Sequence, residues 1–193
     1  MSSRCFIVRD EPRRTVARSL GRLGTVRPPV WYVNAAFRTL RAFVPALARP
    51  DDAFAAAWLP AREFDLYRGM DRRDRDHACR VARRVLAVEP QVPATVVRAA
   101  LLHDVGKSAA PYRAWERIAV HLYRPRRPHG RPAAPAAGTL AAAWQWHQAH
   151  PVRGATMILA AGGDPEVAAL VRQHHDPDGS VGADIIRAVD AAT

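Results

Sequence analysis

Cysteine is scarce in this chain, and its scarcity excludes whole classes of small extracellular protein. Only Cys5 and Cys79 occur among 193 residues. Two cysteines are too few for a disulfide framework, and their wide separation excludes a CxxC metal or redox motif. A reducing compartment is the simplest interpretation, so we expect a cytoplasmic protein.

Long apolar runs are also lacking. The longest stretch without a formal charge, residues 132–152, contains proline, glycine, glutamine and histidine residues that a bilayer core excludes. The pair Arg13 and Arg14 resembles the start of a twin-arginine export signal, but further arginines interrupt the apolar run that should follow. We therefore expect no integral membrane segment and no export.

Acidic residues are nearly absent from the first 50 positions. Ten arginines stand there against Asp10 and Glu11, which gives +8 of the total net charge of +11. This asymmetry predicts a basic N-terminal extension, residues 1–50, helical or irregular, followed by a domain over residues 51–193. Apolar residues at helical spacing between positions 30 and 44 favour a helix that docks on its own domain, so contact of the extension with nucleic acid or a membrane surface is not favoured.

Aromatic residues make up only 7% of the chain, and alanine is abundant. This composition favours helix packing over β-sandwich packing, and no segment predicts a convincing strand, so we expect an all-α fold. Hydrophobic periodicity and helix-stop signals predict helices at residues 63–67, 71–88, 94–105, 111–123, 139–147, 151–161, 165–175 and 182–193, with a loop at 124–138. Asp71 is expected to cap the second helix, and the third should be the buried central helix, closed by Gly106.

Ionisable residues lie on the apolar faces of several expected helices. His77 precedes a stripe of valines, His103 and Asp104 end the central helix, and His174 and Asp190 follow Leu170 and Ile186 by four positions. A single inward histidine is most often a hydrogen-bonded core residue. Several histidines with buried aspartates instead indicate a shared cation, because an unpaired buried carboxylate is costly. Imidazole and carboxylate ligands without thiolate suit Mn, Fe, Co, Ni or Zn, and the sequence does not choose among these.

The run AALLHDVGKS at residues 99–108 resembles the signature of the HD superfamily of metal-dependent phosphohydrolases, in an HDxGK variant. Other segments agree in order and spacing: RDRDHACRVARRVL with His77, HPVRGATMIL with His150 just ahead of an expected Pro-started helix, ALVRQHHDPDG with the pair His174 and His175, and IIRAVDAAT with Asp190. The resemblance extends from about Glu63 to the C-terminus and implies a compact HD-type helical bundle.

The same resemblance implies a role for each matching residue. It assigns His77, His103, Asp104 and Asp190 to a first metal ion, and Asp104 as a bridge with His150, His174 and His175 to a second. Two divalent transition-metal ions are therefore favoured. The implied reaction is hydrolysis of a phosphoester by a metal-activated water, with Asp104 and Lys107 as catalytic residues.

Lys107 is the only lysine in a chain with 29 basic residues. Its ammonium group next to the expected ligands suits a substrate phosphate, although a single lysine also falls there by chance. The triplet Gly106-Lys107-Ser108 imitates the end of a P-loop, but that motif requires a glycine where Leu101 stands. Three other histidines, His121, His129 and His147, have no counterpart in the pattern, and we interpret them as surface or loop residues.

We expect the substrate to be a small phosphorylated compound, most simply a nucleotide. Hydrolysis of a cyclic dinucleotide, as in the distantly similar HD-GYP phosphodiesterases, is an alternative. It is less favoured because residues 178–182 read Asp-Gly-Ser-Val-Gly where those enzymes carry Gly-Tyr-Pro, and because Arg73 replaces a glutamate that some of them place before the first histidine. A second alternative is a non-catalytic nucleotide-sensing module, against which the retention of every expected ligand position argues.

Overall fold

A bundle of helices forms the part of the chain that the computed structural model describes, residues 47–109, 116, 119–120 and 138–193. The helices with defined bounds are α3 (Asp52–Trp58), α4 (Ala61–Arg68), α5 (Arg72–Val88), α6 (Ala94–Leu102), α8 (Leu140–Ala160), α9 (Pro165–Gln173) and α10 (Val181–Ala192), together with the 3₁₀ helix η2 (Val105–Lys107). No strand occurs among these described residues. The all-α prediction is confirmed.

Side chains that precede the helices explain where several of them begin. Asp71 caps α5 by accepting a hydrogen bond from the backbone N–H of Arg73 at 2.9 Å, as the sequence predicts. Asp51, Thr139 and Asp164 cap α3, α8 and α9 in the same way. Each cap satisfies a backbone donor that has no partner inside its helix, which stabilises a helix by about 1 kcal/mol.

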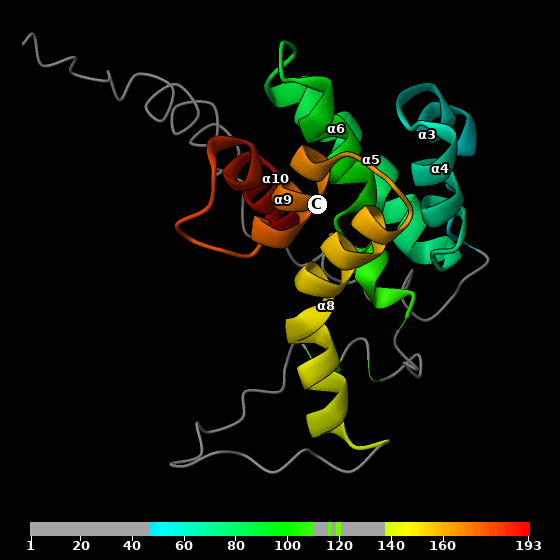
Figure 1. Ribbon diagram of the computed structural model, residues 1–193, viewed down its shortest axis with the longest axis vertical. Helices are drawn as coiled ribbons and strands as arrows, with labels where there is room; N and C mark the ends of the chain where they lie inside the picture. Colours follow the sequence, from blue (N-terminus) through cyan, green and yellow to red (C-terminus); the bar gives the residue numbers. More distant parts are fainter. Residues whose placement is uncertain (1–46, 110–115, 117–118, 121–137) are drawn as a thin grey trace, which may run out of the picture.

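Helix α6 lies at the centre of the bundle, packed between α5 and α9 (Figure 1). Its buried residues are Val96, Val97, Ala99, Ala100, Leu101 and Leu102, so the prediction of a buried central helix is confirmed. Burial of a leucine side chain contributes about 1.5–3 kcal/mol, so this helix supplies much of the hydrophobic stabilisation. Its C-terminal end carries His103 and Asp104 into the interior of the bundle.

The central helix ends earlier than predicted. It stops at Leu102 rather than at Val105, and the chain continues through the 3₁₀ helix η2 instead of a glycine cap at Gly106. Among the described residues only Gly138 and Gly162 have a positive φ, so Gly106 does not adopt the left-handed conformation of a helix cap. Its small size has another use, a close approach to α8, which is described with the metal centre below.

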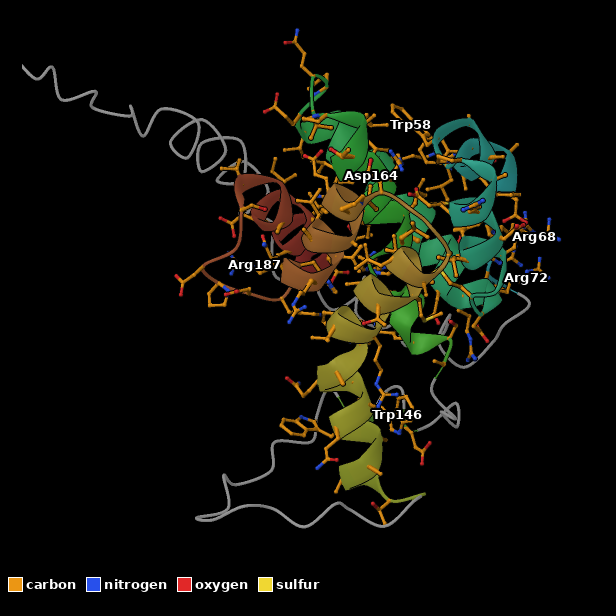
Figure 2. The ribbon with its side chains drawn as sticks, viewed as in Figure 1. Trp58, Arg68, Arg72, Trp146, Asp164 and Arg187 are labelled. Carbon is orange, nitrogen blue, oxygen red and sulfur yellow. The ribbon has the colours of Figure 1, made fainter. Side chains whose placement is uncertain are left out.

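Helix α8 also differs from the prediction. The sequence favoured two helices, 139–147 and 151–161, separated at Pro151, whereas the structure has one continuous helix with Pro151 inside it. Proline is a strong but not an absolute signal for a helix boundary. The N-terminal half of α8 extends away from the other helices, and Trp146 marks this half (Figures 1 and 2). Helix α3 was not predicted either, because its alanine-rich sequence shows no clear apolar period.

Several expectations fall outside the described residues. They are the amphipathic helix between positions 30 and 44, most of the helix at 111–123, the loop at 124–138 except its last residue, and the histidines His121 and His129. The division into an extension of residues 1–50 and a domain of residues 51–193 stays a prediction. At this boundary Ala48 is buried, and the backbone N–H of Arg49 donates to Asp76 at 3.3 Å. No described helix is long and apolar enough to cross a bilayer.

Candidate metal centre

All seven residues predicted as metal ligands meet in one region of the bundle. They come from five places in the chain: His77 from α5, His103 and Asp104 from the segment between α6 and η2, His150 from α8, His174 and His175 from the end of α9, and Asp190 from α10. His103, His150 and His174 are fully buried, and Asp104 is 3% exposed. The fold therefore brings together side chains that are up to 113 positions apart in sequence.

One group of these residues surrounds the side chain of His103. The ligand atoms of His77, His103 and Asp104 lie within 4.8 Å of one another. Asp190 belongs to the same group, because its Oδ1 lies 2.7 Å from Nε2 of His77 and 3.7 Å from Nε2 of His103. Two imidazoles and two carboxylates facing one point form a ligand set for a divalent ion.

A second group lies directly beside the first. The ligand atoms of His150, His174 and His175 also fall within 4.8 Å of one another, and Nε2 of His150 lies 3.2 Å from Nε2 of His174. Asp104 stands between the groups: its Oδ2 is 3.5 Å from Nε2 of His103, and its Oδ1 is 3.3 Å from Nε2 of His150. One carboxylate thus faces both groups with different oxygens.

Backbone carbonyls fix the orientation of the three buried imidazoles. Nδ1 of His103 donates to the carbonyl of Ala100 at 2.9 Å, and Nδ1 of His174 donates to the carbonyl of Val171 at 2.7 Å. Both carbonyls lie in the last turn of a helix, where no intrahelical N–H is available for them. Nδ1 of His150 donates likewise to the carbonyl of His147. When Nδ1 alone carries the proton, Nε2 has a lone pair that can bind a cation in the centre.

A bound cation would satisfy the polar atoms of this centre better than their contacts with one another do. Nε2 of His103 is buried and has no hydrogen-bond partner. Nε2 of His150 and Nε2 of His174 face each other with lone pairs, an arrangement that lacks the shared proton of a hydrogen bond. Buried ring nitrogens without a suitable hydrogen-bond partner are costly, and a bound cation would satisfy them. The C-terminal ends of α6 and α9, which point here, add the negative ends of two helix dipoles.

The electrostatics of the protein chain alone favour charged carboxylates in this centre. Burial raises the pKa of Asp104, but Lys107 and His103 outweigh burial and hold that pKa well below its usual value. Burial likewise raises the pKa of Asp190, and its contacts with His103 and His77 lower it by more. Both carboxylates are therefore ionised at neutral pH and are available as ligands.

The surroundings of two buried imidazoles shift their pKa values in opposite directions. Burial lowers the pKa of His103, but the carboxylates of Asp104 and Asp190 outweigh burial and raise the pKa to about 9. Burial also lowers the pKa of His174, and the neighbouring imidazoles lower it further. His103 therefore holds a proton that a metal ion must displace, whereas His174 is neutral and ready to bind.

Lys107 lies at the edge of the centre, on η2. Its Nζ donates to Oδ2 of Asp104 at 2.7 Å, and 18% of its side chain is exposed. Burial lowers the pKa of this ammonium, but Asp104, Asp74 and Asp190 raise it by more, so the charge is retained. The position of Lys107, between a ligand and solvent, agrees with the predicted contact to a substrate phosphate.

Two glycines allow η2 to approach α8 closely. A Cβ atom on Gly106 would lie 2.1 Å from the carbonyl oxygen of His150 and 2.7 Å from the backbone nitrogen of Gly154. A Cβ atom on Gly154 would in turn lie 3.2 Å from the backbone nitrogen of Gly106. This backbone contact holds His150 of α8 against Asp104, which directly precedes η2.

Two residues near the centre were not predicted from the sequence to lie there. His147 was interpreted as a surface or loop residue, but it lies within α8, is partly buried, and its ring centroid is 5.4 Å from that of His150. Asp74 is buried on α5 one turn before His77 and acts on the pKa of Lys107. The three-residue spacing of Asp74 and His77, and of His147 and His150, was a signal that each pair shares a helix face.

Comparison with known proteins identifies the family. The chain matches the HD domain over residues 75–192, a span that contains every residue of both ligand groups. HD domains bind divalent metal ions and generally act as hydrolases of the metal-dependent phosphohydrolase superfamily. The comparisons with curated proteins and with solved structures give no match. Since the matched span covers more than half of the chain, the protein belongs to the HD-domain family.

Proposed function

We propose that this protein is a metal-dependent phosphohydrolase that cleaves a phosphoester of a nucleotide or of a related small phosphate compound. The observation that carries the proposal is the position of Asp104. Its two oxygens face different ligand groups at 3.5 and 3.3 Å, and the ammonium of Lys107 contacts the same carboxylate at 2.7 Å. Two adjacent cation sites with a cationic side chain beside them suit a phosphoryl group.

Each ligand group supports one ion in this proposal. His77, His103, Asp104 and Asp190 hold the first, and Asp104, His150, His174 and His175 hold the second. When bound, divalent ions at such a centre lower the pKa of a water molecule and offset the charge on phosphoryl oxygens. In the net reaction the water oxygen forms a bond to phosphorus, the ester oxygen leaves, and the water proton passes to bulk solvent or to the leaving oxygen.

In this proposal the substrate reaches the metal centre from its solvent-exposed side. His77 and Asp190 are 25% and 24% exposed, Lys107 is 18% exposed, and His175 lies at the surface, whereas His103 and His150 are closed off. A phosphate that arrives from this side comes within reach of the ammonium of Lys107. Lys107 then binds and orients the phosphate, because its charge is held at neutral pH by the surrounding carboxylates.

Phosphate release from a panel of substrates tests this function. Purified full-length protein is supplied in turn with Mn²⁺, Fe²⁺, Co²⁺, Ni²⁺ or Zn²⁺ and incubated with nucleoside mono-, di- and triphosphates, simple phosphomonoesters and cyclic dinucleotides. We expect hydrolysis of a small phosphoester that chelation abolishes and metal restores, and no hydrolysis by the matched variant Asp104→Ala.

The alternatives predict different outcomes of the same assay. Hydrolysis confined to cyclic dinucleotides would favour a phosphodiesterase, for which the short segment of residues 174–180 between α9 and α10 offers no specific support. Metal-loaded protein that binds nucleotides but hydrolyses none of the panel would contradict the proposal and favour a sensing module.

A further inference from the structure

Pro151 lies in the interior of helix α8, where proline is normally destabilising. It is buried, with eleven helical residues before it and nine after it. Proline in a helix interior costs about 3 kcal/mol, because it lacks the N–H that bonds to the carbonyl four residues earlier and its ring clashes with that carbonyl. A proline at this position therefore requires a compensating gain.

The carbonyl that Pro151 leaves without a backbone donor is that of His147, four residues earlier. This same carbonyl accepts the hydrogen bond from Nδ1 of His150. Any other residue at position 151 would place an N–H on this oxygen. The proline thus creates, in the middle of a helix, the free carbonyl that His103 and His174 find at the ends of α6 and α9.

We propose that Pro151 is a positioning residue for His150. By keeping the His147 carbonyl free, it fixes the imidazole of His150 with the proton on Nδ1 and directs the lone pair of Nε2 toward Asp104 and His174, at 3.3 and 3.2 Å. This inference rests on the proposed metal centre for its consequence, because His150 belongs to the second ligand group. Pro151 then determines how tightly the second ion binds while leaving the first group untouched.

A simpler role for Pro151 must be separated from this one. The proline ring also alters the course of α8 next to η2, where Gly106 contacts the carbonyl of His150. A purely structural role would depend on the bend of the helix or on the volume of the ring. The proposed role depends instead on the missing N–H, so a pair of variants that have the same side chain but either an N–H or an ester oxygen at position 151 distinguishes the two.

The matched pair is Pro151→Ala and a protein in which lactic acid, the ester analogue of alanine, occupies position 151 through nonsense suppression. Both lack the proline ring and carry the same methyl group, but only Pro151→Ala supplies an N–H to the carbonyl of His147. The full chain is used in each case. Circular dichroism checks that both variants keep the helical content of the wild type.

The first measurement is the tautomer of His150 in the metal-free protein, read from ¹H–¹⁵N correlations of its ring nitrogens and assigned with His150→Gln. We expect the Nδ1–H tautomer in the wild type and in the ester variant, and a substantial Nε2–H population in Pro151→Ala. The second measurement is calorimetric titration with Mn²⁺. In Pro151→Ala the second ion should bind about 10- to 100-fold more weakly, as for other losses of a hydrogen bond to a ligand, with the first ion unchanged.

Three outcomes would overturn the proposal. Pro151→Ala could keep the Nδ1–H tautomer and both affinities. Both variants could lose the second ion equally, which would assign the effect to the ring or to the helix bend. The ester variant could alone be impaired. Wild-type protein that binds no Mn²⁺ would refute the proposed metal centre instead, while the tautomer measured without metal would still decide the role of Pro151.

Discussion

Substitution of Gly106 by alanine tests whether the contact between η2 and α8 sets the geometry of the metal centre. The added Cβ would lie 2.1 Å from the carbonyl oxygen of His150, whereas Cβ contacts shorter than 3.0 Å are essentially never observed. The two segments must therefore separate by about 0.9 Å. The atoms in contact belong to the backbone of α8, so no side chain can rotate to relieve the clash.

This separation should weaken the second ligand group more than the first. Asp104 precedes η2 and His150 lies on α8, so the movement acts directly on the 3.3 Å contact between them. Metal–ligand distances tolerate only about 0.2 Å. His77, His103 and Asp190 make no part of the contact. We expect Gly106→Ala to lose the second ion, to keep the first, and to lower the free energy of unfolding by about 1–3 kcal/mol, as overpacking typically does.

Metal analysis of the purified variant, combined with urea unfolding, checks both parts of this prediction. Gly69→Ala is the matched control: its added Cβ would lie 3.3 Å from the nearest atom, the backbone φ is −71°, and Gly69 is the C-cap of α4. The control should keep the metal content of the wild type. A Gly106→Ala protein with wild-type metal content and an unchanged unfolding midpoint would refute the geometric reasoning.

Four further predictions follow from the same structure. Asp104→Ala should reduce the metal content from about two ions per chain toward one or none and abolish hydrolysis, because both groups share this ligand; full metal content on elemental analysis would contradict the two-group centre. Lys107→Ala should keep its metal, since a positive charge beside the ligands is removed, but should raise KM or lower kcat by about 10- to 100-fold in steady-state assays. The pKa of His103 is about 9 in the metal-free protein, against about 6.5 in an unfolded chain, so its protonation stabilises the fold fully below pH about 6.5 and this contribution is lost as the pH rises through 9. Metal binding between these two pH values should release close to one proton, which calorimetry in buffers of different ionisation enthalpy measures. The affinity for metal should therefore rise with pH. Removal of residues 1–50 should leave a folded, metal-binding domain by circular dichroism and metal analysis, and a deletion that ends at position 46 keeps the contacts of Ala48 and Arg49 if the longer one fails.

Local chemistry explains which parts of the fold could be predicted from the sequence. The capping of α5 by Asp71 and the burial of α6 depend on neighbouring residues, and both predictions are confirmed. The clustering of His77, His103, Asp104 and Asp190 followed from apolar stripes that each had to face one core. Their roles as ligands stay predictions, which the metal analyses above test.

The features that the sequence did not reveal depend on contacts between distant segments. Pro151 was predicted to mark a helix boundary, because proline leaves a carbonyl of the preceding turn without its backbone donor. The sequence does not reveal that the imidazole of His150 supplies a donor to that carbonyl, which belongs to His147. Gly106 was predicted to be a helix cap, which is the usual role of a glycine at the end of a helix. The structure requires glycine there for another reason: a Cβ atom on residue 106 would lie 2.1 Å from the backbone of α8. His147 already lay in the predicted helix 139–147, but its approach to the ring of His150 depends on the continuity of α8 past Pro151.

The ends of α6 and α9 have a consequence for the order in which ligands bind. Both helices direct their C-terminal carbonyls at the centre, and Asp104 and Asp190 add two ionised carboxylates. In the metal-free protein the ammonium of Lys107 and the imidazolium of His103 are both engaged with these carboxylates, so neither offers a free positive charge to a phosphate. If the protein has the proposed function, we therefore expect cations to bind before the phosphate. The concentration of free metal would then set the fraction of protein that substrate can enter, however much substrate is present.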